Sequence, residues 1–171
     1  MLTFEGVRLW INAFEENGYL SESLSRLVGH LWTAWERRAI ADVLHYIDLL
    51  QQLDASFRTM HVFEHAEIHL ECGHIYYEMG DYPRAGTEIQ RATELYRGGH
   101  PHNLAVANWL LGCVFWQRSA QSSAIARWER SRRLFDEISK RTQNTNWYQE
   151  RIEQMSETLN YAIDEGRWPY N

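Results

Sequence analysis

One short motif occurs three times in this chain and constrains its fold more than any other feature. Each copy has an apolar residue, a glycine, two further residues and an aromatic residue. The copies are Val28-Gly29 with Trp32, Cys72-Gly73 with Tyr76, and Leu111-Gly112 with Phe115. A helical glycine lets a neighbouring helix approach closely, and an aromatic residue one turn later fills the space beside that contact. The repetition therefore predicts antiparallel pairs of helices.

A second pattern follows the second and third copies of the motif. Small, large and small residues stand at positions i, i+4 and i+7, which share one face of a helix. They are Ala85, Ile89 and Ala92 after the second copy, and Ala124, Trp128 and Ser131 after the third. The apolar residues after the first copy do not fit this spacing. They are Ala39, Ile40, Val43, Leu44, Ile47 and Leu50.

Composition supports a helical protein with one substantial core. The 171 residues are 44% hydrophobic and include three Pro and ten Gly, so long segments lack a strong helix breaker. This length suits a single domain. We therefore expect an all-α domain over residues 1–171.

The two patterns together resemble the signature of the tetratricopeptide repeat family. The best matching residues are Asn108, Leu111, Gly112, Phe115, Ala124, Trp128 and Ser131, followed by His69, Cys72, Gly73, Tyr76, Gly80, Tyr82, Ala85, Ile89 and Ala92. The glycines are 44 and 39 residues apart, since 73 − 29 = 44 and 112 − 73 = 39. This is longer than the usual unit of about 34 residues, and resembles the degenerate long repeats of bacterial regulatory proteins. The resemblance implies antiparallel helical hairpins stacked as a short right-handed solenoid.

We expect about eight helices, including a helix at each end that caps the stack. The predicted repeat-like units are 21–53, 57–97 and 102–139, with an N-terminal helix over 3–17 and a C-terminal capping helix over 146–165. Within the units, helices are predicted near 21–35, 38–53, 57–79, 82–97, 102–117 and 121–139. Residues 24–50 could instead form one long helix, because Glu36-Arg37-Arg38 is a poor breaker.

The family resemblance also implies a binding surface on the concave face of the first helix of each hairpin. The positions that correspond to this face are Leu70, His74, Tyr77, Val106, Trp109, Cys113, Trp116 and Gln117. Tyr76 and Phe115 fall instead on packing positions. We therefore expect a protein or peptide partner in an aromatic groove; the alternative is that these side chains are buried inside the chain or in a homodimer.

Histidines at i, i+4 and i+8 are the sharpest candidates for metal chemistry. They are His61, His65 and His69. Two imidazoles one turn apart can share Zn²⁺ or Ni²⁺, but three successive positions drift around a helix. We interpret them as packing or hydrogen-bonding residues and expect no metal and no cofactor. A small-molecule or metal sensor is the alternative function.

Charge and motif content exclude several function classes. The net charge of −6 disfavours nucleic acid as a partner. Residues 127–141 carry a local balance of +6 − 3 = +3, which we interpret as a solvated helix face. No phosphate-binding loop or serine-nucleophile motif is present, so an enzyme is not expected. No apolar segment is long enough to span a membrane, and Cys72 and Cys113 lie in apolar helical patterns, so we expect a cytoplasmic protein.

Overall fold

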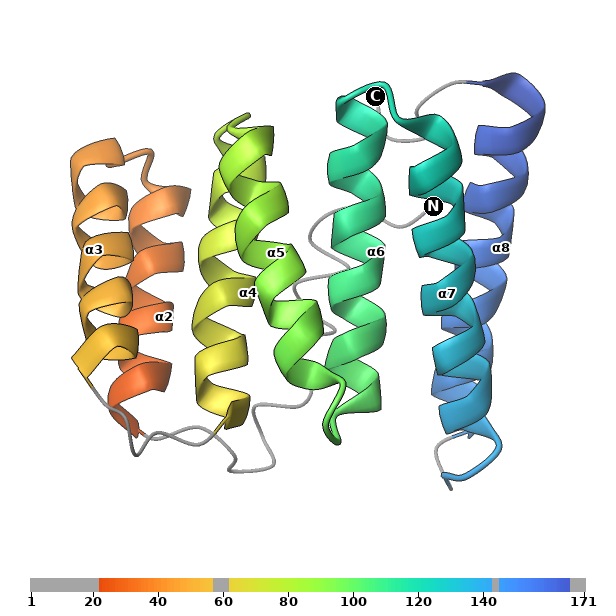
Figure 1. The fold of residues 1–171 in the computed structure, drawn as a ribbon, viewed down its shortest axis with the longest axis horizontal. Helices are drawn as coiled ribbons and strands as arrows, with labels where there is room; N and C mark the ends of the chain where they lie inside the picture. The colour runs from red at the N-terminus through yellow and green to blue at the C-terminus, as the bar shows by residue number, and fades with distance from the viewer. Residues whose placement is uncertain (1–21, 57–61, 143–144, 167–171) are drawn as a thin grey trace. The chain divides into compact units, whose positions relative to one another are not determined.

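The computed structural model describes residues 22–56, 62–142 and 145–166, and in these residues the chain is all-helical with no strand (Figure 1). The helices are α2 (Glu22–Glu36), α3 (Ile40–Ser56), α4 (Val62–Glu78), α5 (Tyr82–Tyr96), α6 (Pro101–Gln117), α7 (Gln121–Ser139) and α8 (Thr145–Glu165). The all-α class is confirmed, and each of these helices lies within a few residues of its predicted bounds where those bounds are described; the predicted start of α4, residue 57, lies outside the described residues. The predicted helix over 3–17 lies outside the described residues.

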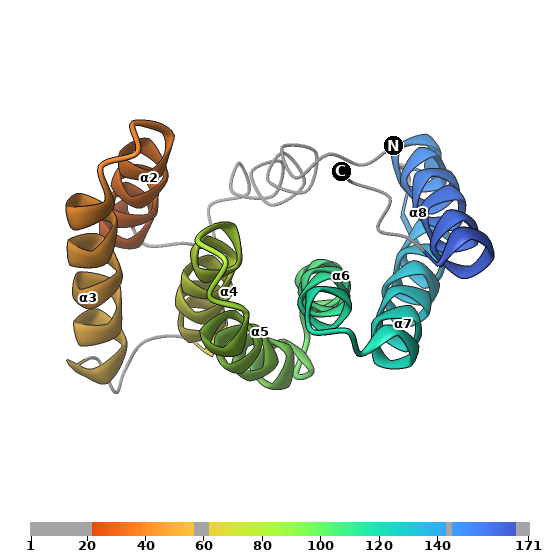
Figure 2. The ribbon, with the colours of Figure 1, turned by 90° about the horizontal axis from the view of Figure 1, so that it is seen from above.

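The chain divides into two compact units, of which one contains α2 to α5 and the other contains α6 to α8. In the first unit, α3 contacts both α2 and α4. In the second, α7 contacts both α6 and α8, and the three helices lie in chain order in the view from above (Figure 2).

Three hairpins, α2–α3, α4–α5 and α6–α7, turn in the same way. Two residues after the first helix of each hairpin comes a residue with a left-handed backbone. The amide of the following residue donates a hydrogen bond to the carbonyl five residues before it, which closes the helix end. The left-handed residues are Arg38 (φ 57°), Gly80 (φ 78°) and Ser119 (φ 59°), and the bonds are Ala39 to Ala34 (3.0 Å), Asp81 to Tyr76 (2.8 Å) and Ala120 to Phe115 (2.8 Å). The turn at Arg38 excludes one long helix over 24–50.

These turns define the repeat register and correct the first copy of the sequence motif. They are 42 and 39 residues apart, since 80 − 38 = 42 and 119 − 80 = 39. Gly73 and Gly112 both lie seven residues before their turns. The residue seven before Arg38 is Leu31, so Gly29 is not their equivalent. Gly29 is exposed, and a Cβ added there would meet no described atom within 4 Å.

The second helices of the hairpins are in register once they are aligned on the turns. Nine residues after each turn stands a large buried side chain, namely Ile47, Ile89 and Trp128. Its neighbours toward either end are Val43 and Leu50 in the first hairpin but Ala or Ser in the other two. In the other two hairpins the helices approach closely at a glycine, which leaves room only for Ala or Ser at these positions. The α2–α3 hairpin has no glycine there, so the larger side chains of Val43 and Leu50 fill the space between its helices.

Close approach at glycine is present in the other two hairpins. A Cβ added to Gly73 would lie 2.6 Å from Ile89 Cγ1, and one added to Gly112 would lie 2.5 Å from Trp128 Cδ1. The predicted role of glycine is confirmed in these hairpins. α6 is buried along most of its length, as expected of a helix that is apolar on every side.

Candidate functional site

The aromatic residues expected in a groove on α6 lie against α7. Trp109, Gly112 and Trp116 are at i, i+3 and i+7 and so share one helix face. The Trp128 ring lies over Gly112, with its centroid 5.6 Å from that of Trp109 and 5.5 Å from that of Trp116. Its indole N–H donates a 3.1 Å hydrogen bond to the Trp109 carbonyl. The three tryptophans form one cluster that joins α6 to α7.

Burial of this cluster is nearly complete. Trp109 is 1% exposed and Trp116 is 9% exposed, whereas Phe115, expected at a packing position, is half-buried. Burial inside the chain, the alternative to an open groove, is therefore what the structure shows for Trp109 and Trp116, and Phe115 is less buried than its neighbour Trp116. Gly112 explains this burial, because it has no side chain and the Trp128 ring lies over it. The Trp128 ring then contacts Trp109 on one side and Trp116 on the other.

The remaining expected groove residues of α6 are also mostly interior. Val106 and Cys113 are each 1% exposed, and Gln117 is half-buried. Burial raises the pKa of the Cys113 thiol to about 12, although a hydrogen bond with Trp128 lowers it. A protonated, enclosed thiol is neither a good nucleophile nor a metal ligand.

The expected groove residues of α4 are likewise buried. Leu70 is fully buried, His74 is 1% exposed and Tyr77 is 8% exposed. The His74 ring contacts Trp32 edge-on, with centroids 4.7 Å apart, and the Trp32 indole N–H donates a hydrogen bond to Glu71. Partner binding by these inner-face residues of α4 and α6 remains a prediction, and this conformation gives a partner little access to them.

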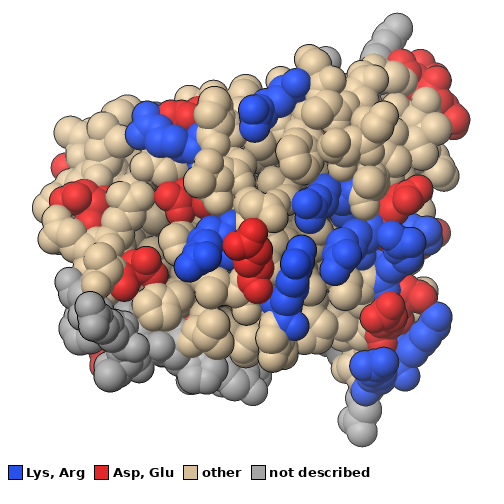
Figure 3. Space-filling model, in the orientation of Figure 1, with Lys and Arg blue, Asp and Glu red and all other residues tan. Residues whose placement is uncertain are grey.

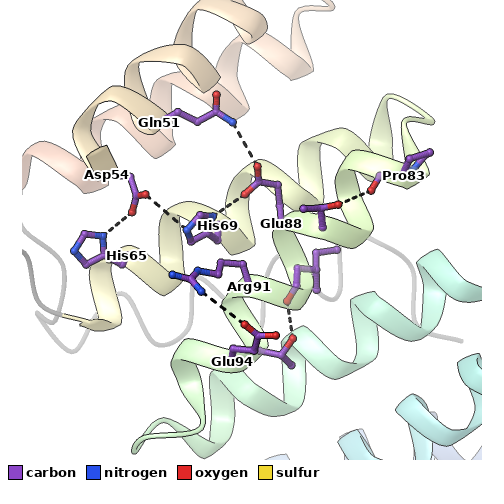
Figure 4. Close-up of polar contacts among 11 residues, drawn as sticks. Gln51, Asp54, His65, His69, Pro83, Glu88, Arg91 and Glu94 are labelled. Atoms are coloured by element: carbon purple, nitrogen blue, oxygen red, sulfur yellow. Dashed lines mark hydrogen bonds and ion pairs between the residues drawn. The ribbon is translucent and has the colours of Figure 1, made fainter. Parts of the chain in front are cut away.

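A polar cluster connects α3, α4 and α5 (Figure 4). His65 Nδ1 lies 2.6 Å from Asp54 Oδ1, and His69 Nδ1 lies 2.6 Å from Glu88 Oε2. His69 Nε2 is also 3.7 Å from Asp54 Oδ2, and Gln51 donates a 3.5 Å hydrogen bond to Glu88. His65 and His69 are thus used to join helices, as the hydrogen-bonding interpretation predicts. His61 lies outside the described residues.

Metal binding has no arranged site in the described part of the chain, which holds no group of three or more His, Cys, Asp or Glu side chains placed to ligate one ion. In the polar cluster, carboxylates contact the Nδ1 atoms of His65 and His69 directly. Cys72, one turn beyond His69, is fully buried, and burial together with the charge of Glu88 raises its pKa well above the usual range.

Sequence reasoning missed a residue that connects α7 to α6. Arg127 Nη1 donates a 3.2 Å hydrogen bond to Asn108 Oδ1, and its guanidinium carbon lies 5.9 Å from the centre of the Phe115 ring. Asn108 is fully buried and is held by a 2.7 Å hydrogen bond to the Leu104 carbonyl. The contacts with Asn108 and Phe115 restrain the guanidinium of Arg127 against α6. The run of arginines was visible in the sequence, but a contact 19 residues away was not.

The electrostatic surroundings of Arg127 are unusual. Burial lowers its pKa, and the positive charges of Arg130 and Arg97 lower it further. Within residues 22–56, 62–142 and 145–166, none of these three arginines forms an ion pair with a carboxylate. Figure 3 shows several basic side chains gathered on the face over α6 and α7.

A small pocket lies near the other end of the α6–α7 pair. Its volume is about 190 Å³, and its lining exposes more apolar than polar surface. The residues around it are Pro101, Glu137, Ile138, Arg141 and Thr142. Pockets for drug-sized ligands are usually about 300–1,000 Å³. This one suits a single side chain better than a free metabolite.

Comparisons with known proteins do not add a function. Neither protein-family models, nor curated protein sequences, nor solved structures gave a match to this chain. Among the described helices, none combines the length and the apolar character needed to cross a membrane.

Proposed function

We propose that this chain is a non-catalytic, protein-binding module built from tetratricopeptide-like hairpins, with a regulatory or scaffolding role in a bacterial cytoplasm. Its partner is a protein or peptide that binds the outer side of α7 beside α6, rather than the buried aromatic cluster. The observation that carries this proposal is Arg127, a half-buried arginine subject to the positive charges of Arg97 and Arg130; among the described residues, none of the three forms an ion pair with a carboxylate.

Arginine with a partly desolvated guanidinium gains most from a carboxylate, because its planar donors match the two carboxylate oxygens. Three other arginines, Arg26, Arg84 and Arg91, have such partners. Arg84 Nε, for example, lies 2.6 Å from Asp81 Oδ2. Burial and the positive charges of Arg130 and Arg97 instead disfavour the charged form of Arg127. An acidic side chain from a partner would stabilise that charge.

A protein fits this surface better than a nucleic acid does. The chain has a net charge of −6, and acidic residues also lie on α7. A long polyanion would meet this opposing charge along its length, whereas a protein segment needs to match only a few positions.

A small-molecule or metal sensor is the second candidate function. The polar cluster favours it, since His65, His69, Asp54 and Glu88 link three helices and would respond together to a ligand. The same contacts also explain the cluster as structural, and for this reason we rank the sensor second.

The test compares proteins retained by three forms of the full chain in lysate of the source organism. The forms are wild type, Arg127→Gln/Arg130→Gln, and a control, Arg26→Gln/Arg132→Gln, that removes the same charge elsewhere. We expect a protein retained by wild type and control and lost with the first variant. If all three forms retain the same proteins equally, or if none of them retains a protein, the proposal that this surface of α7 binds a partner is refuted. Retention of a second copy alone would indicate a homodimer.

A further inference from the structure

Two rows of residues run side by side where α6 meets α7. Pro101, Asn108 and Phe115 are seven residues apart on α6, and Arg127, Leu134 and Arg141 are seven apart on α7. Seven residues are close to two helical turns, so each row follows one side of its helix. The rows meet at both ends. Arg127 contacts Asn108 and Phe115 at one end, and at the other Arg141 lines the pocket with Pro101.

The Arg127 end of these rows is prepared to bind a carboxylate. Asn108 and Phe115 hold the guanidinium, and Arg130 stands one turn further along α7 with its side chain exposed. The single hydrogen bond of Arg127 to a described residue leaves further N–H groups for a ligand. A fixed guanidinium loses less conformational entropy on binding than a mobile one.

The pocket end is prepared to bind an apolar side chain. Ile138 and the exposed residue Pro101 supply apolar lining, and Arg141 and Glu137, which carry opposite charges, also line the pocket. The opposite charges of Arg141 and Glu137 balance at the pocket end, whereas Arg127 and Arg130 at the other end are both positive. The two ends therefore select different residue types.

The distance between the ends sets the spacing of those residue types. Arg127 and Ile138 are eleven residues apart, which is about 16 Å along a helix that rises 1.5 Å per residue. An extended peptide advances about 3.3 Å per residue. Two groups held at the two ends would therefore be about five residues apart in an extended segment.

We propose that α7 and α6 together bind an extended acidic segment of a partner protein, with its carboxylates on Arg127 and Arg130 and an apolar side chain, about five residues away, in the pocket. This inference rests on the proposed function and adds the chemistry of the partner. Charge complementarity argues for this occupant, because the positive charges of Arg97 and Arg130 act on half-buried Arg127, and none of the three forms an ion pair with a carboxylate among the described residues.

The test uses fluorescein-labelled ten-residue peptides and fluorescence anisotropy with the full chain. Each peptide has two adjacent glutamates and one leucine in a Ser-Gly background. The leucine stands two, five or eight positions along the chain from the nearer glutamate, in both chain orders. We expect the tightest binding at five. Arg127→Gln should weaken that binding about tenfold, since bonds to a charged group are among the stronger ones. Ile138→Lys should remove the preference for leucine, and Arg132→Gln should have no effect.

The control position is given by helix geometry. Arg132 is five residues beyond Arg127, which places it about 140° further around α7. Circular dichroism checks that each variant is folded. Binding that ignores the spacing or the leucine, stronger binding of a phosphoserine peptide, or no binding at all would overturn the inference. The lysate comparison decides separately whether α7 binds a protein, so the two proposals can fail independently.

Discussion

Two glycines from the same sequence motif should respond oppositely to alanine. At Gly112, the added Cβ would lie 2.5 Å from Trp128 Cδ1 and 3.0 Å from Trp128 Cε2. The indole cannot easily move, because rings lie on both sides of it and its N–H bonds the Trp109 carbonyl. At Gly29, the added Cβ would meet nothing within 4 Å among the described residues.

The expected magnitudes follow from these surroundings. Gly112→Ala overpacks the core at a cost of about 1–3 kcal/mol and strains one hydrogen bond worth about 1 kcal/mol, while alanine's helix propensity returns about 1 kcal/mol. The free energy of unfolding should therefore fall by about 1–3 kcal/mol. Gly29→Ala has only the propensity gain, so the free energy should rise by up to about 1 kcal/mol.

The assay is urea unfolding followed by far-ultraviolet circular dichroism and tryptophan fluorescence. For a chain of this size, each kcal/mol corresponds to about 2–4 °C in melting temperature, so thermal scans provide an independent check. Gly112→Ala as stable as wild type, or Gly29→Ala as damaging as Gly112→Ala, would refute the proposed packing and the register based on Arg38.

Four further predictions concern the interior. Trp116→Ala should lower the free energy of unfolding by about 3–5 kcal/mol, as for other buried aromatics; a fully stable variant would mean that the ring is not part of the core. A double-mutant cycle of His69→Ala and Glu88→Ala should show a coupling of about 1–2 kcal/mol in urea unfolding, and additive effects would contradict the contact. Zn²⁺ or Ni²⁺ should leave the melting temperature unchanged; a rise that is lost in His65→Ala would show a metal site. A pKa of about 12 keeps the Cys113 thiol protonated at pH 8, so Ellman's reagent should label it only after unfolding; rapid labelling of the folded chain would contradict its burial.

The helices could be predicted from sequence because apolar periodicity and the glycine motif are local signals. The first repeat was misplaced for a physical reason. Its turn uses Arg38 in the left-handed conformation, which is uncommon for a residue other than glycine. Gly29 offered a familiar pattern two residues from the true register. The second turn has a glycine, Gly80, in the left-handed conformation, and the turn between α4 and α5 was predicted at the correct residues.

The candidate surface was less predictable. The spacing of Trp109, Gly112 and Trp116 already placed them on one helix face, and that signal could have indicated a shared contact with Trp128. The position of Arg127 depends on Asn108, which lies on another helix, and no local sequence pattern records that contact. Nor does a local pattern record that Arg127 forms no ion pair with a carboxylate among the described residues.

Site-specific photo-crosslinking tests the central claim most directly. A photoreactive phenylalanine analogue replaces half-buried Leu134, which lies between Arg127 and the pocket, in one form of the chain and Arg132 in the control, and each is irradiated in lysate of the source organism. The account predicts that one protein is crosslinked from position 134 and not from position 132, and that free acidic peptide reduces the yield. Equal crosslinking from both positions, or none from position 134, would contradict binding at this side of α7.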